Sequence, residues 1–407
     1  MIDNIQKFVQ QCEDKAQSQF ALIDAVALKA QEKVLRAFLD NKVSARHFAP
    51  STGYGYSDDS RDTLDKVFAI AFDAESAIVS PGLASGTHAI STALFGVLRP
   101  DDTMLSITGK PYDTLSGVLS GVDGALDSHR IKYAQVELRD NLPDLEAIDR
   151  AISKLRPKIV YLQRSRGYEW RQSLSIAEIG EAVAHIRRSG YDGCIMADNC
   201  YGEFVEATEP CAVGVDVVIG SLIKNPGGGL APTGGYIAGA KRYIDPIAAR
   251  LTCPGLGREI GSYAGDYRPF YQGLFLAPHT VAQALKGSIL FGIAFDTLGY
   301  ETLPKIDNTP LRDITRAIKF GDPDRLIAFC RAIQGISPVD GYVTLYPWDM
   351  PGYNDQVIMA AGSFVQGSSI ELSADAPIRP PYIAYLQGGL TYEHVKLALI
   401  RCLEVIV

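Results

Sequence analysis

The sequence predicts an α/β fold, with a mostly parallel sheet in a large domain and a smaller C-terminal α/β domain. Between about residues 76 and 240, short apolar runs alternate with amphipathic helical segments, the pattern of strands joined by helical crossovers. A long helical segment follows at 278–298, and helical and strand-like segments alternate again after it. With 407 residues, the chain is long enough for two or three domains with buried cores.

The elements of the first 240 residues are expected in a definite order. Apolar positions recur at helical spacing over 12–40, which predicts a helix, and the Gly- and Tyr-rich segment 47–60 is expected to be a loop. Helices are expected from Thr87 and from Ser175, the latter because Ser175 and Glu178 fit a capping box. Strands are expected at 76–80, 103–107, 158–163, 194–198, 215–223 and 235–240.

The C-terminal part is expected to hold helices at 323–333 and 391–406, with strands at 341–347 and 368–374. We therefore expect three regions. They are an N-terminal helix and loop (1–60), a large domain (61–277), and a linking helix with a small C-terminal domain (278–407).

Composition and charge indicate which kinds of molecule the protein binds. Lys+Arg number 39 and Asp+Glu 47, a net charge of −8 without a basic run, which disfavours nucleic acid and anionic membranes. No apolar stretch reaches the ~20 residues of a membrane span, and the start lacks the order of a secretory signal, so a cytoplasmic location is expected. The 7 Cys and 6 His lack ligand spacing, so we expect free thiols and no metal. A small molecule is the expected partner.

Polar residues at three strand ends are candidates for binding or catalysis, because ligands of parallel sheets bind at the carboxyl ends of strands. Ser85, Gly86 and Thr87 open a helix, which suits a phosphate group, although the same string can be a plain N-cap. Asp198 ends a buried strand and either caps a helix or hydrogen-bonds a loop, or it is a fixed negative charge that holds a proton on a ligand cation. Lys224 follows another buried strand, where lost solvation would lower its pKa, unless it is a surface lysine in a Gly-rich turn.

The order of these three features favours one coenzyme. A phosphate cup at 85–87, an acid at 198 and a lysine at 224 are what a pyridoxal-phosphate (PLP) enzyme of the aspartate-aminotransferase-like fold requires. A nicotinamide-binding fold is disfavoured, because no GxGxxG string follows the first strand.

Seven strings make the chain resemble a known family from about residue 45 onward. They are SGTHAI, GKPYDTL, QRSRGYEWR, DNCYGEF, SLIKNPGGG, RPFYQGLFLAPH and IELSADAPIRPPY. The sequence resembles the methionine gamma-lyase/aluminium-resistance family, a branch of the cystathionine gamma-synthase-like PLP-dependent enzymes. The resemblance implies the PLP-dependent transferase fold of type I, with the large domain binding the coenzyme.

The resemblance also implies roles in coenzyme binding. Lys224 would form a Schiff base with PLP, and Asp198 would pair with its pyridine nitrogen. Ser221, Ser85, Gly86 and Thr87 would hold the phosphate, although Ile223 stands where the wider superfamily has a second hydroxyl. Tyr112 would stack on the ring and act as acid or base, with a half-buried core tyrosine as the alternative.

Further roles concern the substrate and a neighbouring subunit. Arg379 would bind the substrate carboxylate. Arg166 would contact the coenzyme and Arg164 the substrate, unless either is structural. The loop residues Tyr54, Tyr56 and Arg61 would reach the neighbour's phosphate in a homodimer, commonly paired into a homotetramer; Arg61 is otherwise a surface charge.

The implied activity is a carbon-sulfur lyase acting on a sulfur-containing amino acid. The products would be a thiol, ammonia and a 2-oxo acid, by a γ-elimination from methionine or a β-elimination from cystathionine. Two alternatives stay open, a PLP-dependent aminotransferase and a non-catalytic PLP-binding stress protein associated with aluminium resistance.

Overall fold

The central sheet lies in the large domain. The computed structural model describes residues 4–306, 310–351 and 353–406. The seven strands follow the order β1-β9-β8-β7-β6-β2-β3 and pair in parallel except at β9, which is antiparallel to both neighbours. They are β1 (Ser76–Ser80), β2 (Thr103–Ser106), β3 (Lys132–Gln135), β6 (Ile159–Gln163), β7 (Cys194–Asp198), β8 (Val217–Ser221) and β9 (Gly235–Gly239). The predicted mostly parallel sheet is confirmed, and β3 is an additional strand.

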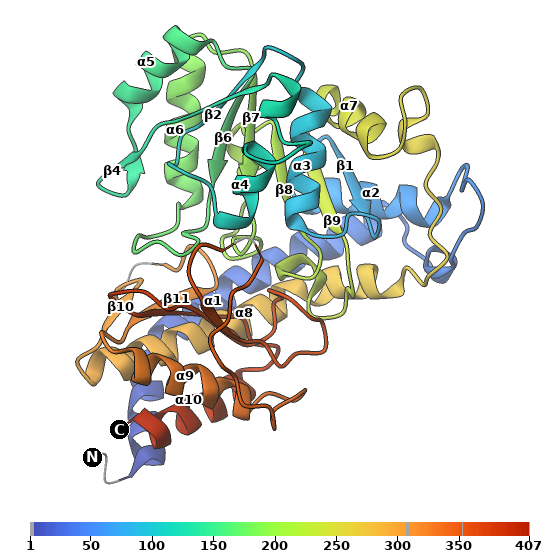
Figure 1. Cartoon of the computed structure of the whole chain (residues 1–407). Coiled ribbons are helices and arrows are strands. Elements are labelled where there is room, and N and C mark those ends of the chain that lie inside the picture. The colour runs from blue at the N-terminus through green and yellow to red at the C-terminus, as the bar shows by residue number, and fades with distance from the viewer. Residues whose placement is uncertain (1–3, 307–309, 352, 407) are drawn as a thin grey trace.

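Both faces of this sheet are buried, which explains why its strands are continuous apolar runs. Alternate residues point to opposite faces, so Met104 joins one apolar cluster and Leu105 the other. Helices lie on both sides of the sheet (Figure 1). They include α2 (Asp59–Ala71), α3 (Gly86–Val97), α4 (Ser116–Leu119), α5 (Leu145–Leu155), α6 (Ile176–Arg188) and α7 (Lys241–Leu251). A small hairpin joins β4 (Leu138–Arg139) to β5 (Leu142–Pro143).

The predicted start of α6 is confirmed in detail. Ser175 accepts a hydrogen bond from the Glu178 backbone N–H at 3.2 Å, and the Glu178 carboxylate accepts one from the Ser175 N–H at 2.9 Å. These two bonds form the capping box expected from the sequence.

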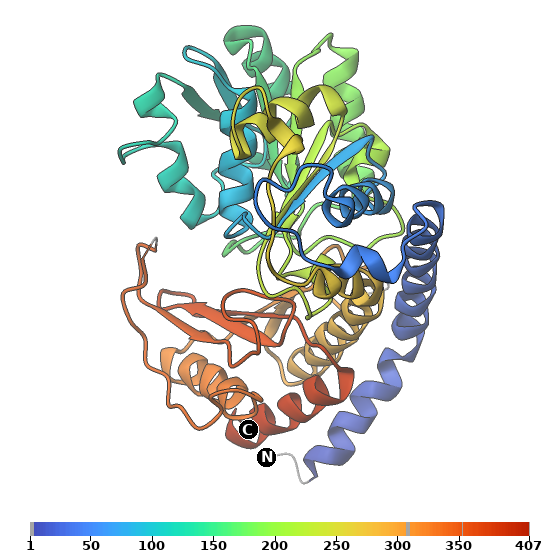
Figure 2. The ribbon, with the colours of Figure 1, turned by 90° about the vertical axis from the view of Figure 1, so that its right-hand side faces the viewer.

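Two long helices link the large domain to the C-terminal part (Figures 1 and 2). Helix α1 (Ile5–Asp40) packs along α8 (Arg268–Thr297). The expected start of the first helix at residue 12 is wrong, because Asn4 caps the helix by accepting from the Lys7 N–H at 2.8 Å. Within the described ranges, no helix combines the length and apolar character needed to cross a membrane.

The expected start of the second long helix at residue 278 is also wrong. Helix α8 begins at Arg268, with Pro269 in its first turn, and Pro278 lies buried inside the helix. The proposed domain limits at 60/61 and 277/278 therefore fall inside helices α2 and α8. These limits stay a prediction of where the domains meet, and they do not coincide with helix ends.

The three consecutive glycines after Lys224 let the chain approach α8 closely. Gly228 has φ +55°, and a Cβ there would lie 2.3 Å from the Gly273 carbonyl oxygen of α8. A Cβ on Gly227 would lie 1.8 Å from the Leu222 carbonyl oxygen. A larger residue at either position would push the lysine loop away from the helix.

The C-terminal domain is an antiparallel sheet with the order β10-β11-β14-β13-β12. Its elements are β10 (Glu301–Leu303), β11 (Thr315–Lys319), α9 (Pro323–Gly335), β12 (Val357–Ala360), β13 (Ser373–Pro377), β14 (Ile383–Gln387) and α10 (Tyr392–Ile406). Both predicted helices are confirmed.

Two strand predictions in this domain need correction. Residues 341–347 form no strand, and only Trp348 beyond them makes an isolated bridge, with Val357. The strand expected at 368–374 begins only at Ser373, because Gly367 and the residues after it turn the chain toward Ile223, whose carbonyl accepts from Ile370 N–H at 3.1 Å.

Candidate active site

A cavity of about 530 Å³ lies between the carboxyl ends of the large sheet and one face of the C-terminal sheet. Its size suits a small organic ligand. Of the predicted site residues, nine line it: Ser85, Gly86, Thr87, Tyr112, Arg166, Asp198, Ser221, Lys224 and Arg379. The structure places the other four, Tyr54, Tyr56, Arg61 and Arg164, outside its walls.

The N-terminus of helix α3 forms one wall. Ser85 is its N-cap and accepts from the His88 N–H at 3.1 Å. A Cβ on Gly86 would lie 3.4 Å from the Ser221 Cβ, so the end of β8 stands directly against the helix start. Backbone N–H groups and the helix dipole make this corner suitable for an anion such as a phosphate.

Asp198 is a buried carboxylate at the end of β7, 2% exposed. It is close to the end of β8 because the two strands pair in parallel. Its Oδ1 accepts a hydrogen bond from the Cys200 backbone N–H at 3.0 Å. Burial raises the pKa of Asp198, while the Lys224 charge and the Cys200 N–H lower it in part. The carboxylate is held to receive a cation or a proton-bearing nitrogen from the cavity.

Lys224 extends its amine into the same cavity, 3.8 Å from the centre of the Tyr201 ring. In the described part of the chain, its Nζ forms no hydrogen bond or ion pair. Burial lowers the pKa of Lys224, but Cys200, Tyr201 and Asp198 together raise it well above the ordinary value. This direction differs from the lowered pKa expected from the sequence, because Cys200, Tyr201 and Asp198 all lie near the amine.

Tyr112 lies in the loop after β2, and its side chain reaches the first turn of α3. Its hydroxyl shares a 2.9 Å hydrogen bond with the Thr87 hydroxyl, and its backbone N–H donates to Gln163 Oε1 at 2.8 Å. Burial raises the pKa of Tyr112, and the Asp198 charge raises it further. The phenol therefore keeps its proton at neutral pH, which makes it a donor rather than a base.

Arg166 is buried in the cavity wall, 1% exposed. One guanidinium nitrogen donates to the Leu303 carbonyl at 3.0 Å, and another lies 3.8 Å from Asp313 Oδ1. Its Nε has no partner among the described residues. Burial lowers the pKa of Arg166, partly offset by Asp313. A buried N–H donor without a partner suits a ligand oxygen.

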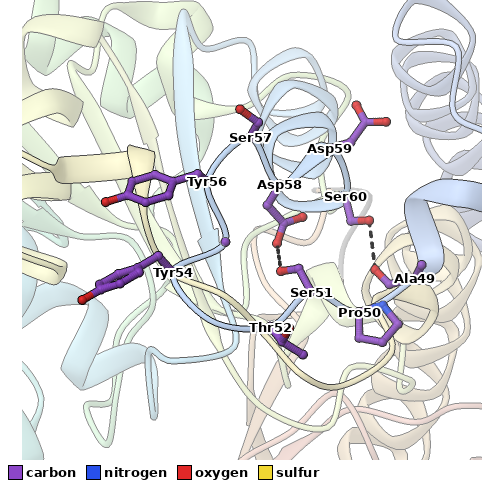
Figure 3. Close-up of a pocket in the computed structure, with 11 residues that line it drawn as sticks. Ala49, Pro50, Ser51, Thr52, Tyr54, Tyr56, Ser57, Asp58, Asp59 and Ser60 are labelled. Atoms are coloured by element: carbon purple, nitrogen blue, oxygen red, sulfur yellow. Dashed lines mark hydrogen bonds between the residues drawn. The ribbon is translucent and has the colours of Figure 1, made fainter.

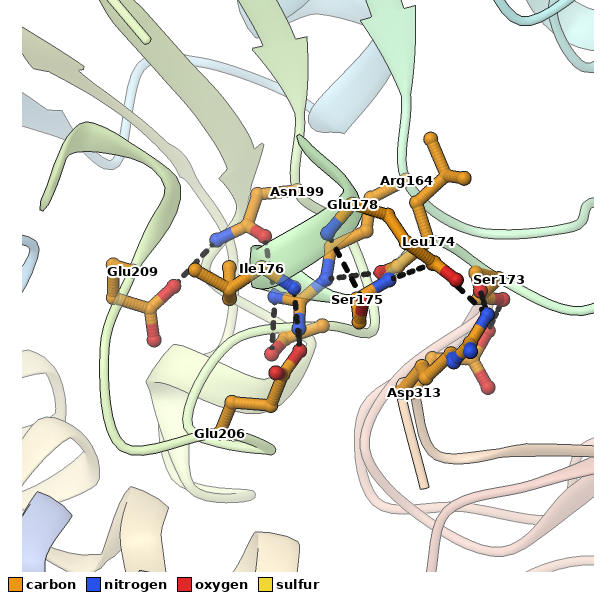
Figure 4. Close-up of polar contacts among 12 residues, drawn as sticks. Arg164, Ser173, Leu174, Ser175, Ile176, Glu178, Asn199, Glu206, Glu209 and Asp313 are labelled. Atoms are coloured by element: carbon orange, nitrogen blue, oxygen red, sulfur yellow. Dashed lines mark hydrogen bonds and ion pairs between the residues drawn. The ribbon is translucent and has the colours of Figure 1, made fainter. Parts of the chain in front are cut away.

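Arg164 has a structural role, which corrects the expectation that it contacts the substrate. It is fully buried, and Figure 4 shows its guanidinium surrounded by protein acceptors. It donates to the Leu174 and Gly202 carbonyls at 3.2 and 2.8 Å, to Asn199 Oδ1 at 2.9 Å and to Glu206 Oε1 at 2.6 Å. Arg164 therefore donates its hydrogen bonds to protein acceptors outside the cavity.

Arg164→Met is accordingly expected to lower the free energy of unfolding by about 3 kcal/mol, because buried acceptors lose their donor. Urea titration followed by circular dichroism measures the change. Arg46→Met is the control: Arg46 is 74% exposed, so its ion pair with Asp59 contributes ~0.5 kcal/mol. Equal effects of the two substitutions would contradict the structural role of Arg164.

Arg379 lies in the cavity wall with 47% of its side chain exposed. Its guanidinium pairs with Asp355 at 2.8 Å. Because Arg379 is half exposed, it can exchange this partner for a ligand carboxylate at small cost.

The loop at 49–60 lines a separate hollow of about 440 Å³ (Figure 3). The rings of Tyr54 and Tyr56 stack with centroids 5.6 Å apart and are 68% and 60% exposed. Arg61 is buried, donates to the Gly55 carbonyl at 3.1 Å and pairs with Asp62 at 2.8 Å. The reading of Arg61 as a surface charge is therefore wrong. The contact of this loop with a neighbouring subunit stays a prediction.

Sequence reasoning missed several residues of the cavity. Cys200 and Tyr201 lie two and three residues after Asp198, and Tyr168 and Tyr353 also line the cavity. Asp375 on β13 is the most informative of them, because it is a carboxylate inside a buried strand, SADAP. Asp198 was selected because it ends a strand of a parallel sheet, whereas Asp375 lies inside an antiparallel strand and does not meet that criterion.

Comparison with known proteins identifies the family. A family model described as methionine gamma-lyase matches residues 5–407. The chain belongs to the methionine gamma-lyase family. YnbB of Bacillus subtilis (strain 168), described as uncharacterized, is 49% identical over 387 residues, 94% of this chain and 91% of the relative.

Solved structures agree with this methionine gamma-lyase fold. A carbon-sulfur lyase involved in aluminum resistance from Clostridium novyi NT has a TM-score of 0.95 at 48% identity, over 100% of this chain and 96% of the other. The pyridoxal-5'-phosphate dependent protein YhfS from Escherichia coli shares the fold alone, with a TM-score of 0.62 at 17% identity, over 93% and 97% of the two chains.

The residues of the cavity fit pyridoxal phosphate. The start of α3 with Ser221 offers an anion site, and Asp198 offers a carboxylate for a protonated ring nitrogen. Lys224 offers a primary amine without a hydrogen-bond partner in the described chain, and Arg166 Nε offers an unused buried donor. The described residues thus supply a counterpart for each polar group of the coenzyme.

Proposed function

We propose that this protein is a PLP-dependent carbon-sulfur lyase of the methionine gamma-lyase family. A sulfur-containing amino acid and water would give a thiol, ammonia and a 2-oxo acid. The observation that carries the proposal is the meeting of Lys224, Asp198 and Tyr112 in one cavity beside the start of α3. When bound, the coenzyme supplies an electron sink for bonds at the substrate Cα.

The chain's own residues have separate roles in this reaction. Lys224 would hold the coenzyme through its side-chain amine, and that amine, freed when substrate binds, would take the Cα proton. A γ-thioether would also have to lose a Cβ proton before the sulfur departs. Asp198 keeps a proton on the ring nitrogen. Tyr112, whose phenol stays protonated, donates to the departing sulfur. The start of α3, Ser221 and Arg166 fix the coenzyme's position.

Arg379 orients the substrate by its carboxylate. Arg379→Ala is expected to raise KM about tenfold or more and to change kcat little, because the contact exists before and during the reaction. Steady-state kinetics with the preferred sulfur amino acid measure both constants. A loss confined to kcat would place the carboxylate site elsewhere.

An aminotransferase would use the same lysine and aspartate, so products must separate the two activities. The holoenzyme is incubated with methionine, cystathionine and cysteine in turn, and thiol, ammonia and 2-oxo acid are measured. Release of all three in equal amounts supports the lyase. Accumulation of pyridoxamine phosphate without thiol would support the aminotransferase, and bound coenzyme without turnover would support the non-catalytic alternative.

The proposal includes the protein's assembly and surroundings. The exposed Tyr54–Tyr56 pair lies on a loop outside its own cavity, which suits a homodimer in which that loop completes the partner's phosphate site. Pairing of dimers into a homotetramer and a cytoplasmic location complete the proposal. Light scattering of the wild type and of Tyr56→Ala would measure the assembly.

A further inference from the structure

Asp375 stands in the cavity wall without a role in the proposed mechanism. It lies on β13 opposite Lys224's side of the cavity and is 5% exposed. Its Oδ1 is buried and has no hydrogen-bond partner among the described residues. Nor does any ion pair in the described chain include this carboxylate. A buried carboxylate without an ion-pair partner is costly, so its place in a ligand cavity suits a cationic ligand.

A second unpartnered group lies beside Asp375 on the same face of the sheet. Gln387 on β14 pairs with Ser373, two residues before Asp375, so the two side chains are diagonal neighbours. Gln387 also lines the cavity, is 4% exposed, and its Nε2 has no partner in the described chain. An acceptor and a donor thus stand side by side, about 7 Å apart at their backbones.

The electrostatic surroundings of Asp375 also suit a cationic ligand. Burial raises the pKa of Asp375 to about 7, although a Tyr168 hydrogen bond and the Lys224 charge lower it in part. The charge of Lys224 lowers the pKa of Asp375, so the proposed reaction centre and this carboxylate interact electrostatically. A ligand ammonium beside Asp375 would stabilise its charged form.

We propose that Asp375 and Gln387 form a subsite for a second amino-acid head group on the substrate. Asp375 accepts hydrogen bonds from the distal ammonium, and Gln387 Nε2 donates to the distal carboxylate. The inference deepens the proposed function and rests on it. It makes Asp375 a specificity-determining residue that favours thioethers with an amino acid at both ends over those with a neutral tail, such as methionine.

The alternative use of Asp375 is as a proton donor to the sulfur. That role would affect every substrate equally, whereas recognition of an ammonium affects only ligands that carry one. Two ligands matched in length separate these roles. L,L-2,7-diaminosuberate is the carbon isostere of cystathionine, and L-2-aminosuberate lacks only the second ammonium.

The holoenzyme is titrated calorimetrically with both ligands. The wild type is expected to bind the diamino ligand about tenfold or more tightly, the usual effect of a charge-assisted hydrogen bond. Asp375→Asn should reduce this preference to below about twofold. The control Asp324→Asn, an exposed aspartate on α9, should keep it.

Two outcomes would overturn the inference. They are equal binding of both ligands by the wild type, and equal weakening of both by Asp375→Asn. The wild-type comparison needs no variant, so misfolding of Asp375→Asn cannot hide the answer. If thiol and 2-oxo acid are still released from methionine while either outcome is seen, the subsite fails and the proposed lyase stands.

Discussion

Lys224→Ala is expected to lose covalently bound coenzyme and to lower kcat/KM about a thousandfold or more. The variant has no amine to hold the coenzyme and no base to take the substrate Cα proton. Its fold should persist, because Lys224 Nζ makes no hydrogen bond or ion pair within the described chain. The absorbance spectrum, far-ultraviolet circular dichroism and the thiol assay measure these three properties.

The control is Lys241→Ala, which removes an exposed lysine of α7 that pairs with Asp245 on the surface. It should retain both the spectrum and the turnover of the wild type. Unchanged coenzyme absorbance in Lys224→Ala would remove this lysine from the mechanism.

Asp198→Asn is expected to bind the coenzyme more weakly and to lose at least about a hundredfold in kcat. Asparagine has nearly the same shape but lacks the negative charge that holds a proton on the ring nitrogen. The Cys200 N–H bond can pass to the amide oxygen, so the loop should keep its conformation. Equilibrium dialysis against PLP and single-turnover kinetics measure binding and chemistry separately.

Asp245→Asn supplies the matched control, since Asp245 is 60% exposed on α7. It should not change coenzyme affinity or kcat. Near-normal turnover by Asp198→Asn would contradict the role given to this carboxylate.

The sequence was informative where the strands of the large sheet end. Asp198 ends β7 and Lys224 follows the neighbouring parallel strand β8, while Ser85 to Thr87 open the helix after β1, so one sheet edge brings them together. This follows from the geometry of parallel strands and needs no side-chain detail. The burial of both faces of the large sheet could also be predicted, because its strands are continuous apolar runs.

The two arginines of QRSRGYEWR show where such reasoning stops. Arg164 and Arg166 follow β6 by one and three residues, which would place them on the same side of a continued strand. The strand ends at Gln163, and the loop turns Arg164 toward Glu206 and leaves Arg166 in the cavity. Only the path of the loop separates a structural arginine from a site residue.

The C-terminal domain was harder for a different reason. Its strands are short and antiparallel, and the pairing of β11 with β14 joins segments that are distant in sequence, so the local residue pattern predicts this sheet poorly. Residues 341–347 alternate as a strand does, yet no strand pairs with them. Asp375 was missed because the expected strand ended at residue 374, just before it.

The most direct test of the account is the absorbance spectrum of the purified protein before and after addition of methionine, cystathionine and cysteine. A coenzyme held by Lys224 predicts a band near ~420 nm that shifts when one of these is added, together with release of thiol and 2-oxo acid. If no band appears even after addition of PLP, the proposed coenzyme and the lyase activity are both contradicted.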